Sequence, residues 1–347
     1  MMSSLCIVGA GAAGAGAADA LRDTDIDVTV LEKSRGVCGR AATRRKHGCR
    51  YDHGANYVKD PDERTTEFIR ALGEEGLVDI EEPVWTFDAA GRISESDSRD
   101  DHKFTWEAGI TQLAKRLFAR TDAEIRHETR VAAVDQEGDR WAVTDTDGEG
   151  HGPFDALLVT PPAPQTASIL SDTRWDDGRL PRLREAVGAV PYRTVRSYVL
   201  HYPFELNRPW YGLVNVDKDH DVGWLSREEC KPGHVPDGES LLVVQMAHDW
   251  STAQYDAPLD ETVDDVAAMV ADLLDDSALA EPDWYDDQGW RYAQPDGGVS
   301  DVVHEAESAG LFFAGDWVVG EGRVHAALWN GVEQGERVGE YLATTVL

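Results

Sequence analysis

The sequence has little cysteine and no long apolar run among its 347 residues. Its four cysteines have no C-x-x-C spacing, which argues against a zinc site and a disulfide framework, so we expect no metal. No apolar run approaches the length that spans a membrane, and no basic segment precedes the first apolar residues as in a signal peptide. We therefore expect a cytoplasmic protein without a membrane partner, in which Cys6 is a buried thiol.

Lysine is also scarce, since only seven of the 33 basic residues are lysine, and 65 acidic residues give a formal net charge of −32. The acidic residues are spread along the chain and do not form a tail. Such an excess destabilises a compact state by self-repulsion in dilute solution, whereas high salt screens charges within a few Å. The composition favours a halophilic globular protein, and an acidic protein with a basic partner is the alternative.

One segment reverses this charge, because residues 33–50 hold seven basic residues and no acidic residue. A local cluster of positive charge in an acidic chain indicates an anionic ligand. Nucleic acid is not expected as that ligand, since the surrounding negative charge would repel it.

A glycine-rich motif follows the first apolar run. Residues 5–8 are long enough for one buried strand, and Gly9-Ala10-Gly11-Ala12-Ala13-Gly14 then matches G-x-G-x-x-G. Small residues continue through residue 20, residues 27–31 indicate a second strand, and Glu32 ends that strand. This order of strand, glycine turn, helix, strand and acid is typical of a dinucleotide-binding unit.

The residue types of this motif have separate physical roles. The first glycine makes a tight turn, the second lets a pyrophosphate approach the backbone, and the third lets helix and strand pack closely. The helix N-terminus then faces the phosphates, and the acid accepts a hydrogen bond from a ribose hydroxyl. The motif does not distinguish NAD from FAD, and a glycine-rich helix start without a ligand is the alternative.

Hydrophobic periodicity and turn residues predict the remaining elements. Helices are expected at 63–77, 109–120, 259–274 and 325–345, and a hairpin or loop at 85–98. Strands are expected at 125–134, 141–146, 154–160, 194–201, 212–216, 222–225, 241–247 and 311–314. The segment 35–45 is predicted to be a loop that wraps around phosphate. From about residue 165 the pattern becomes that of a sheet with one long helix, and the C-terminal strand and helix return to the first domain.

Several segments together resemble known flavoproteins. The glycine motif with Glu32, the Gly39-Arg40 loop and residues 313–316 resemble the FAD-binding pattern of the amine oxidase-like flavoproteins. Within that family, residues 39–44, 52–57, 290–293 and 322–324 resemble the renalase branch. The resemblance implies an α/β fold, in which a Rossmann-like FAD-binding domain like that of p-hydroxybenzoate hydroxylase carries a discontinuous α+β substrate domain. We predict the FAD-binding domain at 1–62, 108–165 and 300–347, and the substrate domain at 63–107 and 166–299.

The sequence departs from the family pattern at two points. Residues 38–40 are Cys-Gly-Arg where the family has Gly-Gly-Arg, so the backbone near the pyrophosphate is less free. Residues 52–57 read Asp-His-Gly-Ala-Asn-Tyr where the family has Asp-Leu-Gly-Ala-Gln-Tyr, which places His53 and a shorter amide at Asn56. Both departures fall where a substrate is expected to meet the flavin.

The resemblance and the motif together assign the site. Residues expected to bind FAD are Gly9, Gly11, Ala12, Ala13, Gly14, Glu32, Lys33, Gly39, Arg40, Thr43, Asp52, Gly54, Ala55, Asn56, Val131, Gly315, Asp316, Arg323 and Val324. Asn56, Trp290, Arg291 and His325 are the candidate catalytic residues bordering the substrate. Core packing for Trp290, a surface ion pair for Arg291 and a structural hydrogen bond for His53 and His325 are the alternatives.

The resemblance also implies the reaction. We expect an oxidoreductase in which a small reduced substrate, a dihydronicotinamide isomer of NAD(P)H, gives a hydride to flavin N5, and O2 takes the electrons to form hydrogen peroxide. Such a substrate needs no base, because formation of the aromatic ring drives hydride loss. The alternatives are an FAD-dependent amine oxidase or desaturase-type dehydrogenase, and a flavin-binding redox module without turnover.

Overall fold

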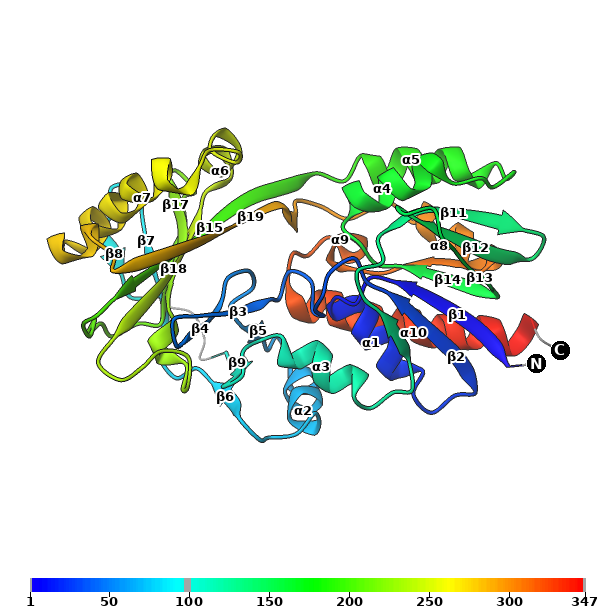
Figure 1. Cartoon of the computed structure of the whole chain (residues 1–347), viewed down its shortest axis with the longest axis horizontal. Coiled ribbons are helices and arrows are strands. Elements are labelled where there is room, and N and C mark those ends of the chain that lie inside the picture. The colour runs from blue at the N-terminus through cyan, green and yellow to red at the C-terminus, as the bar shows by residue number, and fades with distance from the viewer. Residues whose placement is uncertain (1, 97–100, 346–347) are drawn as a thin grey trace. The chain divides into compact units, whose positions relative to one another are not determined.

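A computed structural model describes residues 2–96 and 101–345 of the chain (Figure 1). The chain forms two compact units, each assembled from separate segments. The first unit comprises Met1–Gly39, Leu113–Tyr192 and Gln294–Leu347, and the second comprises Arg40–Gln112 and Arg193–Ala293. The predicted FAD-binding and substrate ranges cross these boundaries. Residues 40–62 and 108–112 lie in the second unit, and residues 166–192 and 294–299 lie in the first.

A parallel sheet forms the centre of the first unit. Its strands lie in the order β10 (Glu124–Arg126), β2 (Ile26–Leu31), β1 (Ser3–Val8), β14 (Ala156–Val159) and β20 (Leu311–Phe313). Residues of these strands are buried on both faces of the sheet, which explains why the strands read as continuous apolar runs. Cys6 is fully buried in β1, as the sequence predicts.

Different layers cover the two faces of this sheet. Val8, Leu157 and Phe313 share an apolar cluster with a second, antiparallel sheet and with the helices beside it. That layer contains β11 (Val131–Glu137), β12 (Arg140–Asp145), β13 (Gly150–Phe154), α4 (Ala163–Asp172), α5 (Arg179–Gly188) and α8 (Val302–Glu305). On the other face lie α1 (Ala12–Ala20) and the C-terminal α10 (Val324–Thr345), which run side by side (Figure 1). The remaining helices of the unit are α3 (Gln112–Phe118) and α9 (Asp316–Val319).

Helices α1 and α10 approach so closely that their backbones touch. A Cβ atom on Gly331 of α10 would lie 2.1 Å from the carbonyl oxygen of Ala13, and one on Gly335 would lie 2.7 Å from that of Ala17. From the other side, a Cβ atom on Gly16 would lie 2.6 Å from the carbonyl oxygen of Leu328. Glycines on both helices therefore set the spacing at which α10 holds α1 against the sheet.

The second unit is built on a mixed sheet. Its strands lie in the order β19 (Trp284–Pro295), β15 (Tyr192–Tyr202), β18 (Ser240–Met246), β17 (Val222–Arg227), β16 (Gly212–Asn215), β7 (Val84–Phe87) and β8 (Ile93–Ser94). Helix α7 (Leu259–Leu274) packs its apolar face, which includes Val263, Val266 and Val270, into the cluster on this sheet. Its acidic residues lie on the opposite face, as its 3.6-residue periodicity predicts.

Smaller elements complete the second unit. A hairpin of β3 (Thr43–Lys46) and β4 (Cys49–Asp52) precedes a small sheet of β5 (Val58–Lys59), β9 (Lys103–Trp106) and β6 (Leu77–Asp79). The helices are α2 (Glu63–Ala71) and α6 (His248–Ala253), and a short 3-10 turn covers Glu228–Cys230. Among the described residues, no helix combines the length and apolar character that crossing a bilayer requires.

The α/β fold class is confirmed, and α7 has the bounds predicted for it. Two local predictions are corrected, and some elements were missed. The segment 35–45 is not entirely a loop, because β3 begins at Thr43; the helix predicted to residue 77 ends at Ala71; and α4, α5 and β19 were not predicted. The hairpin predicted at 85–98 is formed by β7 and β8, and its residues 97 and 98 lie outside the described part of the chain.

Candidate functional site

The glycine turn lies between β1 and α1, and its first and third glycines have no room for a side chain. Gly9 has a φ of +100°, and a Cβ atom there would lie 2.7 Å from Oγ1 of Thr160. A Cβ atom on Gly14 would lie 2.1 Å from the carbonyl oxygen of Gly9. These two positions require glycine for the turn and for close packing of helix on strand.

Gly11, the second glycine, is different. It has an extended backbone, with φ −73° and ψ −173°, and nothing lies within 4 Å of a Cβ atom placed on it. Gly11 is the N-cap residue of α1 and has no side chain that could accept from the first N–H groups of the helix. These N–H groups therefore face the open space beside Gly11. An uncapped helix N-terminus beside an open glycine suits an anion such as a pyrophosphate.

Glu32 directs its carboxylate at the same turn. Its Oε2 accepts from the backbone N–H of Ala10 at 2.7 Å, and its Oε1 accepts from that of Ser34 at 2.8 Å. Glu32 follows β2 directly and is only 5% exposed. The fold therefore fixes the acid beside the glycine turn, and each oxygen keeps a further lone pair for a ribose hydroxyl.

The loop after β2 returns to the glycine turn. The N–H of Cys38 donates to the carbonyl oxygen of Ala10 at 2.8 Å, and a Cβ atom on Gly39 would lie 3.6 Å from Cα of Gly11. Cys38 has a φ of +79°, in the left-handed region that favours glycine. The departure noted in the sequence at residue 38 is thus a cysteine in a conformation suited to glycine.

The C-terminal segment adds a second turn to the first unit. The N–H of Gly315 donates to Oδ1 of Asn330 at 2.9 Å, and Asp316, 4% exposed, begins α9. His325 lies in the first turn of α10, is 6% exposed, and has its Nε2 3.3 Å from Glu321. Asn330 was not predicted from the sequence, because one amide inside a helix gives no motif.

The other predicted positions of this unit are placed as follows. Ala12 and Ala13 form the first turn of α1, and Val131 begins β11, where it pairs with Asp145. Lys33 is exposed, with its Nζ 3.4 Å from Oε1 of Gln165. Arg323 is exposed and Val324 begins α10. No contact of these residues tests their roles toward a cofactor, which stay predictions.

In the second unit, Arg40, Gly54 and Trp290 lie together. Nη1 of Arg40 donates to the carbonyl oxygen of Ala293 at 2.9 Å, and the carbonyl oxygen of Arg40 accepts from the N–H of Ala55 at 3.0 Å. A Cβ atom on Gly54 would lie 2.0 Å from that carbonyl oxygen and 3.0 Å from the Trp290 ring. Gly54 therefore permits the segment 52–57 to pack against β19.

His53 stacks on Trp290, with ring centroids 5.4 Å apart and planes inclined by 13°. Nε1 of Trp290 donates to the carbonyl oxygen of His53 at 3.0 Å. Burial, with the nearby Arg44 guanidinium, lowers the pKa of His53 to about 4. The imidazole is therefore neutral at physiological pH, and its buried Nδ1 has no hydrogen-bond partner among the described residues.

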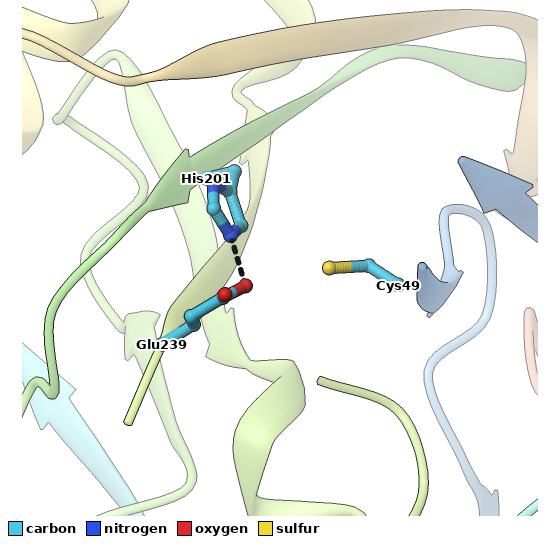
Figure 2. A group of neighbouring side chains, drawn as sticks. All are labelled: Cys49, His201 and Glu239. Carbon is cyan, nitrogen blue, oxygen red and sulfur yellow. Dashed lines mark hydrogen bonds and ion pairs between the residues drawn. The ribbon is translucent and has the colours of Figure 1, made fainter. Parts of the chain in front are cut away.

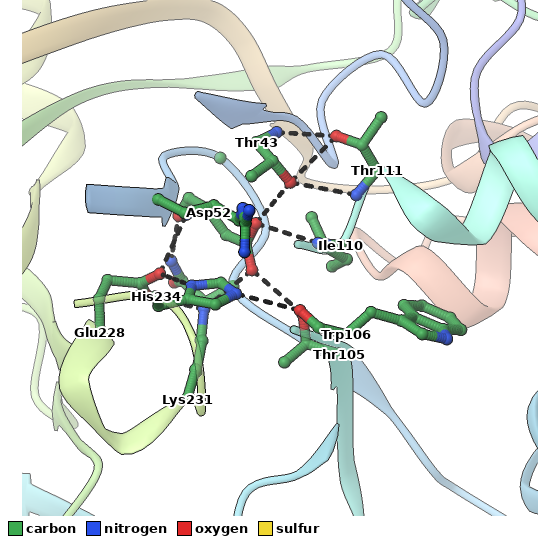
Figure 3. Close-up of polar contacts among 12 residues, drawn as sticks. Thr43, Asp52, Thr105, Trp106, Ile110, Thr111, Glu228, Lys231 and His234 are labelled. Atoms are coloured by element: carbon green, nitrogen blue, oxygen red, sulfur yellow. Dashed lines mark hydrogen bonds and ion pairs between the residues drawn. The ribbon is translucent and has the colours of Figure 1, made fainter. Parts of the chain in front are cut away.

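Asp52 lies in a fully buried network rather than at an open surface (Figure 3). Its carboxylate accepts from Oγ1 of Thr43 at 2.7 Å and from the N–H of Ile110 at 3.0 Å, and lies 3.0 Å from Nζ of Lys231. Burial raises the pKa of Asp52, but Lys231 and the hydrogen bonds outweigh it and hold this pKa below its usual range. Thr43 also exchanges hydrogen bonds with Thr111, so both predicted cofactor residues are engaged by protein groups.

The rest of this network places Lys231 between two carboxylates, those of Asp52 and Glu228. Glu228 lies 2.7 Å from Nζ of Lys231 and 3.0 Å from Nδ1 of His234. Nε2 of His234 lies 3.0 Å from the carbonyl oxygen of Trp106, so both ring nitrogens of His234 face oxygen atoms. The sequence did not identify Glu228, Lys231 and His234, since buried charges resemble surface charges in a sequence.

The remaining candidates of the second unit differ in exposure. Asn56 is buried, and its Nδ2 donates to the carbonyl oxygen of Asp52 at 2.7 Å. Nε2 of Gln245, which was not predicted, donates to the carbonyl oxygen of Gly54 at 2.6 Å. The Arg291 side chain is exposed, lies over the Tyr255 ring at 4.1 Å and is 3.5 Å from Asp256. The ion pair considered as the alternative for Arg291 is therefore present.

The first unit has the features that a dinucleotide requires. Gly11 leaves space that any side chain would fill, α1 offers uncapped N–H groups to a pyrophosphate, and Glu32 is fixed at the end of β2. These donors fit the ADP half of FAD as well as that of NAD.

Comparison with known proteins also indicates a dinucleotide-binding domain. A family profile described as NAD(P)-binding Rossmann-like domain matches residues 7–72, and one described as Flavin containing amine oxidoreductase matches residues 86–338. A protein from Exiguobacterium sp. 255-15, provisionally assigned as a protoporphyrinogen oxidase, is similar in structure, with a TM-score of 0.78 and 17% identity over 99% of this chain and 100% of that one.

Two further solved structures have the same fold. Cyclohexylamine oxidase from Brevibacterium oxydans IH-35A has a TM-score of 0.75 at 14% identity, covering 99% of this chain and 100% of that one. A fatty acid isomerase from P. acnes that produces CLA has a TM-score of 0.70 at 15% identity, covering 96% and 98%. At such identities the similarity establishes the fold and not the substrate.

Proposed function

The chain belongs to the flavin containing amine oxidoreductase family, and we propose that it is an FAD-dependent oxidase of the renalase type that acts on a dihydronicotinamide isomer of NAD(P)H. The glycine turn, α1 and Glu32 hold the ADP half of FAD. Asp316 would bind the ribityl hydroxyls, and the N-terminus of α10 at Val324 would stabilise negative charge on the ring. When bound, FAD would supply the hydride-accepting N5, with O2 as the final acceptor of the electrons and hydrogen peroxide as the product.

The charge state of the candidate substrate residues supports a dihydropyridine over an amine. His53 is neutral, Asn56 and Trp290 are uncharged, and the Asp52 carboxylate is neutralised within its buried network. An ammonium substrate needs an anion or an aromatic cage to bind it and must lose a proton before it is oxidised, whereas a dihydropyridine needs neither. The neutral His53–Trp290 pair is the observation on which this choice of substrate rests.

The residues of this chain then act by position and exclusion of water. One face of the Trp290 indole stacks on the buried imidazole, and the flat, apolar ring of Trp290 would suit a nicotinamide ring. The exposed Arg291 guanidinium suits the phosphates of a nucleotide, which lie in water during binding. Formation of the aromatic nicotinamide drives hydride loss, so no side chain has to take a proton from the substrate.

Stopped-flow reduction of the purified flavoprotein in molar salt tests the proposal. Without O2, dihydronicotinamide isomers should bleach the flavin absorption rapidly, whereas primary amines and polyamines should not. Admission of air should restore the absorption and form one equivalent of hydrogen peroxide per substrate.

Two other outcomes would replace the proposal. Bleaching by amines alone would identify an amine oxidase, to which the family and the cyclohexylamine oxidase fold also lend support. Reduction without turnover under air would identify a flavin-binding redox module. We further propose that the protein works in a high-salt cytoplasm, for which the charge of −32 is the support. Full activity and cooperative unfolding in dilute buffer would contradict this.

A further inference from the structure

A thiol, an imidazole and a carboxylate from three distant segments meet inside the second unit (Figure 2). Cys49 comes from the β3–β4 hairpin, His201 from β15, and Glu239 from the turn that precedes β18. Sγ of Cys49, a ring nitrogen of His201 and a carboxylate oxygen of Glu239 all lie within 4.8 Å of one another. Figure 2 shows the three side chains directed toward a common point.

This arrangement is close to the geometry of a tetrahedral metal site. Zn²⁺ binds sulfur at about 2.3 Å and nitrogen or oxygen at about 2.0–2.2 Å, so its ligand atoms lie roughly 3.5 Å apart. Nε2 of His201 and Oε2 of Glu239 are now 2.8 Å apart, and the thiol lies within the 4.8 Å limit. Small side-chain rotations would therefore bring all three atoms to bonding distance from one ion.

The surroundings fix the imidazole in the orientation that a ligand needs. Nδ1 of His201, the nitrogen remote from the cluster, makes no hydrogen bond among the described residues, and Oδ2 of Asp283 lies 3.5 Å away, so a small rotation of Asp283 would supply one. Trp284 stacks on the ring with a centroid distance of 4.9 Å and an angle of 12°. A carboxylate on the second ring nitrogen is the usual partner of a zinc-bound histidine, because it sets the tautomer and raises the basicity of the ligand.

The burial of the cluster and the types of its donor atoms restrict which metal ion it can bind. Cys49 is 2% exposed and His201 4% exposed, and the thiol lies in an apolar cluster with Tyr51 and Leu241. Glu239 is about one-third exposed, which leaves a path from solvent. Sulfur, nitrogen and oxygen donors together suit Zn²⁺ and not Mg²⁺ or Ca²⁺, which take oxygen ligands.

We propose that Cys49, His201 and Glu239 form a Zn²⁺ site in which water supplies the fourth ligand. Binding releases the thiol proton to solvent, so the ion, one thiolate and one carboxylate are electrically neutral together. The site joins the β3–β4 hairpin to two strands of the large sheet and acts as a cross-link between segments far apart in the sequence. The competing arrangement is a metal-free imidazolium held between the carboxylates of Glu239 and Asp283, in which Cys49 has no part.

Zinc binding to the holoprotein distinguishes these arrangements. The flavoprotein is dialysed against a chelator, then titrated with Zn²⁺ alone in molar salt, and bound metal is measured by equilibrium dialysis. The wild type should take up one tight equivalent and unfold at a higher temperature with zinc than without it. Cys49→Ser should weaken that equivalent by about 100-fold or more, and Asp283→Asn by about 10–100-fold.

Two variants keep the test decisive. Cys230→Ser removes a cysteine of the same unit that lies outside the cluster, and it should bind zinc like the wild type. Glu239→Gln removes a ligand from a partly exposed position and serves if Cys49→Ser does not fold, with retained flavin absorption reporting folding. Loss of the tight equivalent in Glu239→Gln but not in Cys230→Ser supports the site. If the wild type binds no zinc, or binds it no more tightly than Cys49→Ser, surface carboxylates account for any uptake and the proposal is wrong.

Discussion

The backbone N–H of Cys38 donates to the carbonyl oxygen of Ala10 at 2.8 Å while Cys38 itself adopts left-handed backbone, with a φ of +79°. This hydrogen bond ties the loop after β2 to the glycine turn. It needs the left-handed conformation and not the cysteine, because the donor is a backbone group. Residue 38 therefore carries a conformational cost that a glycine would avoid.

Comparison of two substitutions isolates that cost. Cys38→Gly and Cys38→Ala both delete the thiol, but only the glycine removes the clash of Cβ that disfavours left-handed backbone. We expect Cys38→Gly to exceed Cys38→Ala in free energy of unfolding by about 1 kcal/mol, after allowance for the extra freedom of glycine in the unfolded chain. Urea denaturation in molar salt measures the difference, and equal stabilities would show that the loop relaxes without strain.

Gly11 should be needed for the cofactor and not for the fold. Its backbone is accessible to any residue, and the space beside it is open, so Gly11→Ala should leave the stability of the apoprotein within about 0.5 kcal/mol. The added methyl group would lie where the pyrophosphate is expected, and FAD affinity should fall at least tenfold. Gly36→Ala, in an equally open place on the next loop, is the control, and FAD titration by fluorescence gives both affinities.

The contact between α1 and α10 predicts opposite effects for two glycines of one helix. A Cβ atom on Gly331 would lie 2.1 Å from a backbone oxygen that cannot move alone, so Gly331→Ala should cost about 1–3 kcal/mol or more. A Cβ atom on Gly339 would meet only the end of the Leu21 side chain at 3.3 Å, and alanine favours helix. Gly339→Ala should therefore be neutral or stabilise by up to about 1 kcal/mol. Similar losses for both variants would contradict this account.

The sequence predicted the elements whose signal is local. The strand before Gly9 and the helix after it, the apolar face of α7 and the C-terminal strand and helix all have short-range patterns of period or punctuation. Strand β19 was missed because its aromatic, acidic and polar residues do not alternate, as in the adjacent pairs Trp284-Tyr285 and Asp286-Asp287. The segment 35–45, which includes the first residues of β3, was predicted as a loop because its arginines suggested phosphate, whereas Arg44 pairs with Asp286 of β19 at 2.6 Å.

In the candidate site, too, only the residues that lie in one local motif could be predicted from the sequence. The spacing of the glycines and the acid follows from one supersecondary unit, so it can be read directly from the sequence. Asp52 was chosen by resemblance, and its partners Glu228 and Lys231 lie about 180 residues away in the chain. The meeting of Cys49 with His201 is equally non-local. Contacts of this kind depend on how strands are ordered in a sheet, which no local pattern encodes.

Lys231 neutralises a buried pair of carboxylates, so its removal should be costly. Lys231→Met keeps the length of the side chain but leaves the buried carboxylates of Asp52 and Glu228 without the ammonium that lies between them. We expect a loss of about 3–5 kcal/mol in the free energy of unfolding. The exposed Lys115→Met should change it by less than about 0.5 kcal/mol. A small effect of Lys231→Met would mean that water enters the network or that a carboxylate takes up a proton.

The low pKa of His53 makes stability depend on pH in a window that can be stated. Burial holds this pKa near 4 in the folded protein, against about 6.5 in the unfolded chain, so the unfolded state binds more protons between these values. The stability that His53 contributes is therefore complete above about pH 7 and is lost as the pH falls toward 4.

His53→Leu, which restores an apolar side chain at this position, should remove the His53 contribution to that dependence. Between pH 7 and pH 5 the wild type should lose about 2 kcal/mol more than the variant, because protonation of the unfolded chain draws the equilibrium toward it. Asp52 does not produce the same slope, since a carboxylate whose pKa is lowered loses its contribution only below about pH 4. Urea denaturation of both proteins at the two pH values gives the comparison, and parallel losses would show that the imidazole is protonated in the folded state.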